Sequence, residues 1–154
     1  YLLDQQKNVT GAVKSNFGGY QTHDNLHKEG VFREFVTTLE NIANEIFIQY
    51  SSEKLVVDAL WGNINTYGNF NAAHVHDGEL SGVMYLQVPK ESGRIVFVNP
   101  AVRSDTHAIR VKNYAVQPEA LGCLIFPSWL EHYVEPNTSS ENRISLSFNL
   151  CRKK

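Results

Sequence analysis

The longest periodic pattern in the sequence is a stripe of apolar residues that ends at Tyr50. Its members recur at steps of three and four residues: Phe32, Phe35, Val36, Leu39, Ile42, Ala43, Ile46, Phe47 and Tyr50. This spacing places them on one face of an α-helix, and the residues between them are mostly polar. We therefore predict one long amphipathic helix after Gly30, with its apolar face covering a sheet. Residues 1–28 lack such a pattern, and we expect them to be irregular.

Beyond Glu53 the pattern changes to short apolar segments separated by turn residues. These segments are residues 55–61, 70–76, 81–88, 94–98, 109–116, 121–126, 131–135 and 143–150. Short strands at such regular spacing are typical of an antiparallel sandwich or barrel. The chain is thus predicted to be mainly β, a jelly roll with the long helix packed on it near the N-terminus. Residues 99–108 are polar, and we expect an exposed loop there.

Composition and charge exclude several classes of protein. The chain has 154 residues, of which 42% are hydrophobic and 19% charged, so we expect one folded domain over residues 1–154. A formal net charge of −2 argues against bulk binding of nucleic acid. No apolar run reaches the length of a membrane span, so no membrane partner is expected. The two cysteines, Cys123 and Cys151, form no metal or disulfide motif, which favours a reducing, cytoplasmic compartment.

Two histidines at the end of one predicted strand are the first candidates for chemistry. His74 and His76 stand just before Asp77 and Gly78, a pair typical of a turn. Residues i and i+2 of a strand share a face, so both imidazoles should point to one place, as two ligands of one metal do. His132 is the third candidate ligand. Asp77 should point to the other face unless a bulge reverses it, and it stays a less favoured substitute.

Arg143 is the second unusual feature, because it follows His132 closely and begins an apolar segment. If residues 131–135 and 143–147 form a hairpin, His132 and Arg143 lie opposite each other. A cation beside a metal-binding histidine is best explained by an anion between or beyond them. Arginine suits this role because it grips a carboxylate through two parallel hydrogen bonds.

This order of residues resembles the signature of the 2-oxoglutarate and Fe(II)-dependent oxygenases. In that family a histidine pair, or a histidine and a carboxylate, precedes a distant histidine and then an Arg-x-Ser motif. The resemblance is closest to small bacterial and phage members and covers nearly the whole chain. The segments that carry it are residues 16–22, 74–76, 81–86, 93–100, 126–132 and 143–149.

The resemblance implies a double-stranded β-helix, a form of jelly roll, that uses Fe(II) and the cosubstrate 2-oxoglutarate. It implies His74, His76 and His132 as metal ligands, with Arg143 on the distal carboxylate of the cosubstrate and Ser145 beside it. Further cosubstrate contacts would come from Tyr85, Tyr67 and Asn69. The implied reaction oxidises 2-oxoglutarate to succinate and carbon dioxide while it hydroxylates a substrate.

The second metal position departs from the family, which usually has a carboxylate there. Three readings stay open: a three-histidine site, Asp77 as the carboxylate, or His76 outside the ligand set. Two other functions also remain. The protein could be a cupin-type metal protein or three-histidine dioxygenase that does not use 2-oxoglutarate, or a non-catalytic β-sandwich module. The substrate, a small molecule or a peptide, is not specified by the sequence, and a homodimer is left open.

Overall fold

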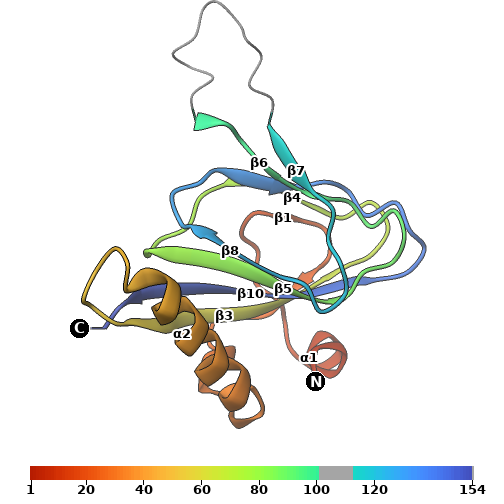
Figure 1. Ribbon diagram of the computed structural model, residues 1–154. Helices are drawn as coiled ribbons and strands as arrows, with labels where there is room; N and C mark the ends of the chain where they lie inside the picture. The colour runs from red at the N-terminus through yellow and green to blue at the C-terminus, as the bar shows by residue number, and fades with distance from the viewer. Residues whose placement is uncertain (101–112, 154) are drawn as a thin grey trace, which may run out of the picture.

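The computed structural model describes residues 1–100 and 113–153, which form two β-sheets facing each other (Figure 1). The helices are α1 (Leu2–Asn8) and α2 (Arg33–Phe47), with short 3-10 turns at Leu26–Lys28 and Gly30–Phe32. The strands are β1 (Asn16–Phe17), β2 (Tyr20–Gln21), β3 (Leu55–Asn65), β4 (Phe70–His74), β5 (Leu80–Gln87), β6 (Ile95–Phe97), β7 (Tyr114–Val116), β8 (Cys123–Pro127), β9 (His132–Val134) and β10 (Arg143–Arg152).

The two sheets differ in strand length but each contains five antiparallel strands. The major sheet has the order β2-β3-β10-β5-β8, and the minor sheet has the order β1-β4-β9-β6-β7. The long strand β10 lies at the centre of the major sheet, between β3 and β5. Its residues alternate in character because successive side chains of a strand point to opposite faces. Thus Ile144, Leu146, Phe148 and Leu150 are buried in the core beneath the helices, while Arg143, Ser145, Ser147 and Asn149 line the space between the sheets.

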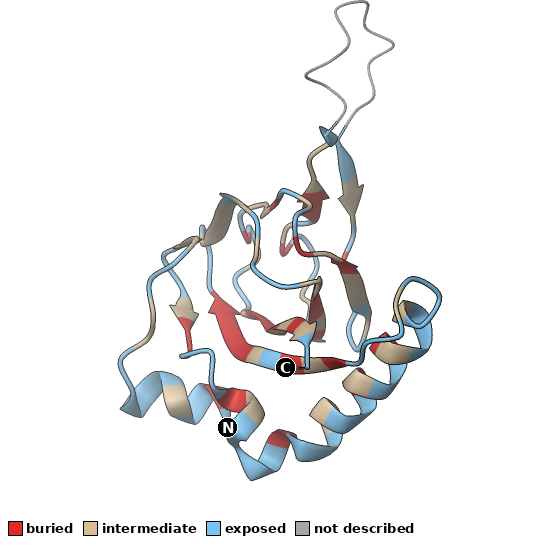
Figure 2. Cartoon of the chain, turned by 90° about the vertical axis from the view of Figure 1, so that its left-hand side faces the viewer, coloured by how far each residue is buried: buried red, intermediate tan, exposed pale blue. Residues whose placement is uncertain are grey.

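Both helices pack on the outer face of the major sheet (Figure 1). The larger apolar cluster lies at this interface, where Leu39 and Ala43 of α2 are buried and Phe35 packs edge-on against Phe148. A smaller cluster around Val83 and Phe126 lies between the sheets. In Figure 2 the outer faces of the helices are exposed, and most of the buried residues lie on the strands above them. The predicted mainly-β jelly roll with a helix packed on it is therefore confirmed.

The predicted apolar stripe is longer than the buried face of α2. The helix ends at Phe47, and Tyr50 beyond it is 80% exposed. Ile42 and Ile46 are each 47% exposed, so one side of the apolar stripe faces solvent. Two polar residues of the helix instead hold the edge of β3. Asn44 donates to the carbonyl of Leu55 and accepts from its N–H, and Glu40 accepts from the N–H of Val57.

The expectation of an irregular N-terminus is wrong, since residues 1–28 contain α1 and two short strands. Strand β1 pairs with β4 of the minor sheet and β2 pairs with β3 of the major sheet, so residues 12–24 join the two sheets. We call this segment the N-terminal strap. Gly18 and Gly19 both adopt positive φ between the two strands, and a Cβ on Gly18 would collide with the Asn69 side chain. Glycine is required there because other residues are strained in this conformation.

Most predicted strands are present with shifted ends. The strand predicted at 55–61 continues to Asn65, and the one predicted at 70–76 ends at His74. The predicted strand 109–116 corresponds to β7 at its end, while residues 109–112 and most of the predicted loop 99–108 lie outside the described residues. Within residues 1–100 and 113–153, no helix has the length and apolarity that a membrane span requires.

Candidate metal and cosubstrate site

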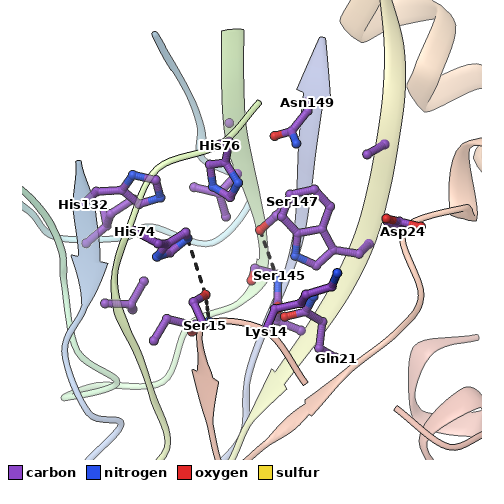
Figure 3. A pocket seen from close by; sticks show the side chains of 18 of the residues that line it. Lys14, Ser15, Gln21, Asp24, His74, His76, His132, Ser145, Ser147 and Asn149 are labelled. Carbon is purple, nitrogen blue, oxygen red and sulfur yellow. Dashed lines mark hydrogen bonds between the residues drawn. The ribbon is translucent and has the colours of Figure 1, made fainter. Parts of the chain in front are cut away.

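Three histidines from the minor sheet meet in the space between the sheets (Figure 3). His74 ends β4 and His132 begins β9, and the two are directly opposite in the antiparallel register. His76 follows two residues after His74. The ring centroids are 4.4 Å apart for His74 and His132, 4.8 Å for His74 and His76, and 5.1 Å for His76 and His132. One nitrogen from each ring lies within 4.8 Å of the other two, which is close enough for one metal ion to bind all three.

Backbone contacts fix which nitrogen of two of these rings is free to bind a metal. Nδ1 of His74 lies 2.7 Å from the carbonyl oxygen of Ala72, and Nδ1 of His132 lies 2.9 Å from that of Leu130. A carbonyl can only accept, so Nδ1 carries the proton in each ring. The lone pair is therefore on Nε2 of both histidines. Orientation of a metal-binding histidine through its other nitrogen is common in metal sites.

The surroundings of the three rings keep them neutral. Burial, together with the proximity of His74 and His132, lowers the pKa of His76 to about 3. Burial lowers the pKa of His132 to about 4, although its hydrogen bond to Leu130 acts in the opposite direction. The pKa of His74 is also lowered, mainly by burial. Neutral imidazoles at pH 7 are ready to bind a metal without first losing a proton.

Asp77 does not join this group. It is exposed and lies on the wall of the cavity, whereas the three imidazoles form the cluster by themselves. Among the described residues, the structure thus brings together three histidines and no carboxylate. Imidazole ligands suit iron, copper, nickel and zinc, so the donor set fits Fe(II), although it lacks the carboxylate that non-haem iron oxygenases usually provide.

The predicted hairpin between His132 and Arg143 is wrong. Strand β9 pairs with β4 and β6 in the minor sheet, while Arg143 begins β10 in the major sheet. The polar segment between them is a crossover from one sheet to the other. Asn137 in this segment is fully buried and donates to the carbonyls of Asn65 and Glu141. His132 and Arg143 therefore line the same cavity from opposite sheets.

Arg143 is a buried cation without an acidic partner. Its side chain is 2% exposed, and Nη1 donates to the carbonyls of Ser92 and Glu135. No Asp or Glu within residues 1–100 and 113–153 forms an ion pair with it. Burial lowers the pKa of its guanidinium. A buried charge is stable only when it is paired, so this position favours an anion in the cavity.

A row of polar side chains crosses the inner face of the major sheet next to Arg143. Cα pairing places Tyr85, Ser145, Asn63 and Gln21 side by side on four neighbouring strands, and all four line the cavity. Each is less than 10% exposed. Burial raises the pKa of the Tyr85 hydroxyl to about 12, against the opposing effect of Arg143, so it stays protonated and can donate.

The cavity that holds these groups has a volume of about 900 Å³. Of the predicted cosubstrate contacts, Arg143, Ser145 and Tyr85 line it. Tyr67 is 71% exposed and does not line it, and Asn69 instead donates to the Thr66 side chain outside it. The position of these two residues in a turn before β4 directs them away from the space between the sheets.

Sequence reasoning missed several lining residues. Asn63 and Asn65 lie at the C-terminal end of β3, beyond the predicted end of that strand, and both line the cavity. Their alternation with Ile64 is the period of two that could have extended the strand. Ser15 and Gln21 lie on the N-terminal strap, where two-residue strands leave no such pattern. The hydroxyl of Ser15 is 3.5 Å from Nε2 of His74 and accepts from Asn71.

Residues 59–149 match the sequence model of the family described as "Putative 2OG-Fe(II) oxygenase". The match spans more than half of the chain and includes all three histidines and Arg143. The chain belongs to this family. Its members are defined by Fe(II) and 2-oxoglutarate, so the expected family, fold and cofactors are confirmed. No curated protein matches the sequence.

Several solved structures share this fold. A prolyl-4-hydroxylase of Pseudomonas putida has a TM-score of 0.69 and 15% identity, over 98% of this chain and 80% of the other. HygX of Streptomyces hygroscopicus, solved with nickel and 2-oxoglutarate bound, has a TM-score of 0.72 and 10% identity, over 99% and 77%. A prolyl hydroxylase of Trichoplax adhaerens, in complex with a hypoxia inducible factor peptide, has a TM-score of 0.73 and 12% identity, over 98% and 74%. At such identities the likeness concerns the fold alone.

Proposed function

We propose that this protein is a 2-oxoglutarate and Fe(II)-dependent dioxygenase that hydroxylates a C–H bond of its substrate, with release of succinate and carbon dioxide. The observation that carries the proposal is the pairing of two features in one cavity. A cluster of three neutral imidazoles lies on one sheet, and a buried arginine without an acidic partner lies on the other. A metal alone would explain the histidines but would leave the arginine without a role.

His74, His76 and His132 would hold the metal, and we propose His76 rather than Asp77 as the third ligand. When bound, Fe(II) supplies the activation of dioxygen that oxidises the cosubstrate and the substrate. The histidines contribute their fixed orientation, since the backbone carbonyls of Ala72 and Leu130 hold two of the rings. No proton has to leave these rings before the metal binds.

Arg143 would bind the distal carboxylate of 2-oxoglutarate. Its Nη1 is already held by two backbone carbonyls, so the side chain is positioned before the cosubstrate arrives. The Tyr85 hydroxyl and the Ser145 hydroxyl lie in the adjacent row of the sheet and can donate to the same carboxylate. A dicarboxylate is thus fixed at one end by the major sheet and presented at the other end to the histidines.

The walls of the cavity contribute by excluding water from the reacting groups. Phe126 packs edge-on against His132 at 4.8 Å between ring centroids, and Trp61 lies 5.6 Å from His76 by the same measure. Apolar surroundings strengthen the electrostatic interactions inside the site and suppress side reactions.

An anaerobic titration tests the proposal directly. Metal-free protein receives Fe(II) and then 2-oxoglutarate while the visible charge-transfer band of the chelated keto acid is recorded. We expect the band to saturate at about one equivalent and to be absent in His132→Ala. Tight metal binding without a band would overturn the oxygenase proposal in favour of a three-histidine protein that does not use 2-oxoglutarate. Absence of metal binding would leave a non-catalytic module.

A second measurement distinguishes hydroxylation from the other reactions that an oxygenase of this kind can catalyse. The structural neighbours include an epimerase and a carbocyclase, so the fold supports other outcomes of the same chemistry. Once a substrate is identified, mass spectrometry of the product distinguishes them. A gain of one oxygen atom for each succinate released supports hydroxylation, and a product without added oxygen contradicts it.

A further inference from the structure

The N-terminal strap forms one wall of the cavity, although it lies outside the residues that match the family. Both ends of the strap are held by backbone hydrogen bonds. The N–H of Ala72 donates to the carbonyl of Ser15, and the N–H of Thr22 donates to that of Gly62. The Thr22 hydroxyl also accepts from the N–H of Gly62. The strap is therefore a fixed wall, and its side chains are placed to contact a molecule in the cavity.

Gln21 is the buried polar residue of this wall. Its side chain is 6% exposed and lines the cavity, and its amide has no hydrogen-bond partner among the described residues. Asn63, its neighbour in the row, donates to the Ser147 hydroxyl and faces the same space. The described buried side-chain atoms without a partner belong to Tyr20, His27 and Ser92, so the Gln21 amide is open to the cavity and its N–H groups can donate to a molecule there.

Lys14 adds a positive charge to this wall. It belongs to the same strap as Gln21, and both side chains line the cavity, as Figure 3 shows. Lys14 is exposed, and neither Asp24 nor Asp77, the two acidic residues of the lining, forms an ion pair with it. An ammonium group and an amide N–H offer two donors to one planar anion, which fits the two oxygens of a carboxylate.

The cosubstrate leaves this part of the cavity free. Under the proposed function, 2-oxoglutarate extends from the histidines to Arg143 on β10, and strand β3 separates β10 from Gln21 on β2. A volume of about 900 Å³ is near the upper end for a ligand pocket and can hold a second small molecule. Two separate cationic positions in one cavity thus indicate two anionic ligands.

We propose that the substrate carries a carboxylate, which Lys14 and Gln21 bind beside Asn63 while the carbon to be oxidised faces the histidines. The proposal rests on the proposed function for the place of the cosubstrate. It identifies the substrate as an organic acid, or an amino acid or peptide bound by its carboxylate. Selection of the substrate then lies in the N-terminal strap, while the metal and cosubstrate are bound by residues 59–149.

A titration with two matched probes tests this site. Protein loaded with Zn(II), which is redox-inert, is saturated with 2-oxoglutarate and titrated with N-acetylglycine or with its uncharged amide. The reporter is the indole N–H of Trp61 in proton–nitrogen correlation spectra. The chain has two tryptophans, so the variant Trp129→Phe assigns the signal. We expect saturable shifts with the acid and none with the amide.

Variants locate the binding to the strap. Lys14→Met and Gln21→Leu should each weaken binding of N-acetylglycine about tenfold, the effect of one charged hydrogen bond. Lys7→Met, which removes a lysine from α1 outside the cavity lining, is the matched control and should change nothing. All three variants should keep the affinity for Zn(II) and 2-oxoglutarate.

Other outcomes overturn the proposal. Equal binding of acid and amide, or binding unchanged in both strap variants, shows that no carboxylate is recognised here. Tighter binding of inorganic phosphate than of N-acetylglycine contradicts the assignment to a carboxylate. Weaker 2-oxoglutarate binding in Gln21→Leu assigns this amide to the cosubstrate. If 2-oxoglutarate does not bind at all, the proposed function fails, and comparison of Arg143→Ala with Lys14→Met still shows which cation binds the probe.

Discussion

The two sheets hold the two halves of the site in different ways. The minor sheet carries His74 at the end of β4 and His132 at the start of β9, with His76 two residues past β4, and backbone carbonyls two residues away orient His74 and His132. The major sheet carries Arg143, Ser145 and Tyr85 on strands of eight and ten residues, backed by the helices. Both halves join residues far apart in the sequence, but the rings of His74 and His132 are oriented by local contacts, whereas Arg143 is held by the carbonyls of Ser92 and Glu135, 51 and 8 residues away. We call His74, His76 and His132 the metal half, and Arg143, Ser145 and Tyr85 the anion half. A substitution in one half should impair ligand binding there and leave the other half intact.

The largest effect is expected from the metal half. His74→Ala and His76→Ala should each reduce affinity for Fe(II) at least about a hundredfold, because even outer-sphere partners of metal ligands contribute tenfold to a hundredfold. Asp77→Ala is the control and should stay within about threefold of the parent protein. Anaerobic metal titration by calorimetry measures this. A greater loss in Asp77→Ala than in His76→Ala would replace the three-histidine site with a site that includes a carboxylate.

A substitution in the anion half should weaken binding of 2-oxoglutarate and leave metal binding unchanged. Arg143→Met removes the buried cation, and we expect 2-oxoglutarate affinity to fall at least about thirtyfold, since truncation of one partner of a buried charge pair costs about 2–5 kcal/mol. Metal affinity should remain unchanged. Thermal unfolding provides the measurement, because a ligand that binds the folded state raises the melting temperature. In metal-loaded Arg143→Met, 2-oxoglutarate should no longer raise it, whereas Arg152→Met, outside the cavity, should behave as the parent.

The histidine half should make the metal-free protein sensitive to acid. The pKa values of His76 and His132 are lowered to about 3 and about 4, whereas an unfolded histidine titrates near pH 6.5. Between these values the unfolded chain binds more protons, so the free energy of unfolding falls as the pH falls below about 6.5. The loss is at most about 1.4 kcal/mol per pH unit for each imidazole.

Urea unfolding at pH 7 and pH 5 measures this difference. His132→Leu removes one of the histidines with a lowered pKa and should reduce the loss of stability between the two pH values. An equal loss in both proteins would show that burial of His132 does not contribute to the acid sensitivity.

The smallest effect is expected from the Tyr85 hydroxyl in the anion half. Tyr85→Phe removes one hydroxyl next to Arg143, and we expect 2-oxoglutarate to bind up to about tenfold more weakly, the value of one hydrogen bond. Because the pKa of Tyr85 is raised to about 12, the parent protein should bind 2-oxoglutarate equally at pH 7 and pH 9. Calorimetric titration at both pH values tests this. Unchanged affinity in Tyr85→Phe would remove the hydroxyl from the cosubstrate site.

The sequence was most informative where function depends on local spacing. The His-x-His pair predicted that His74 and His76 point to one place, whereas Arg143 and Ser145 were predicted as cosubstrate contacts from the resemblance to the family. The crossover between His132 and Arg143 could not be predicted, because a polar segment has the same composition in a hairpin and in a connection between sheets. Gln21 was missed for a related reason. A strand of two residues is stabilised by its partner strand and leaves no hydrophobic period of its own.

The hydrogen bonds between α2 and β3 also protect the folded chain from aggregation through an exposed strand edge. The first part of β3 lies at an edge of the major sheet, where free backbone groups would attract the strand of another molecule. Asn44 and Glu40 bind the N–H groups of Leu55 and Val57, and Asn44 also binds a carbonyl. Two helical side chains thus take the place of a neighbouring strand, and the edge offers another molecule few partners for β-pairing.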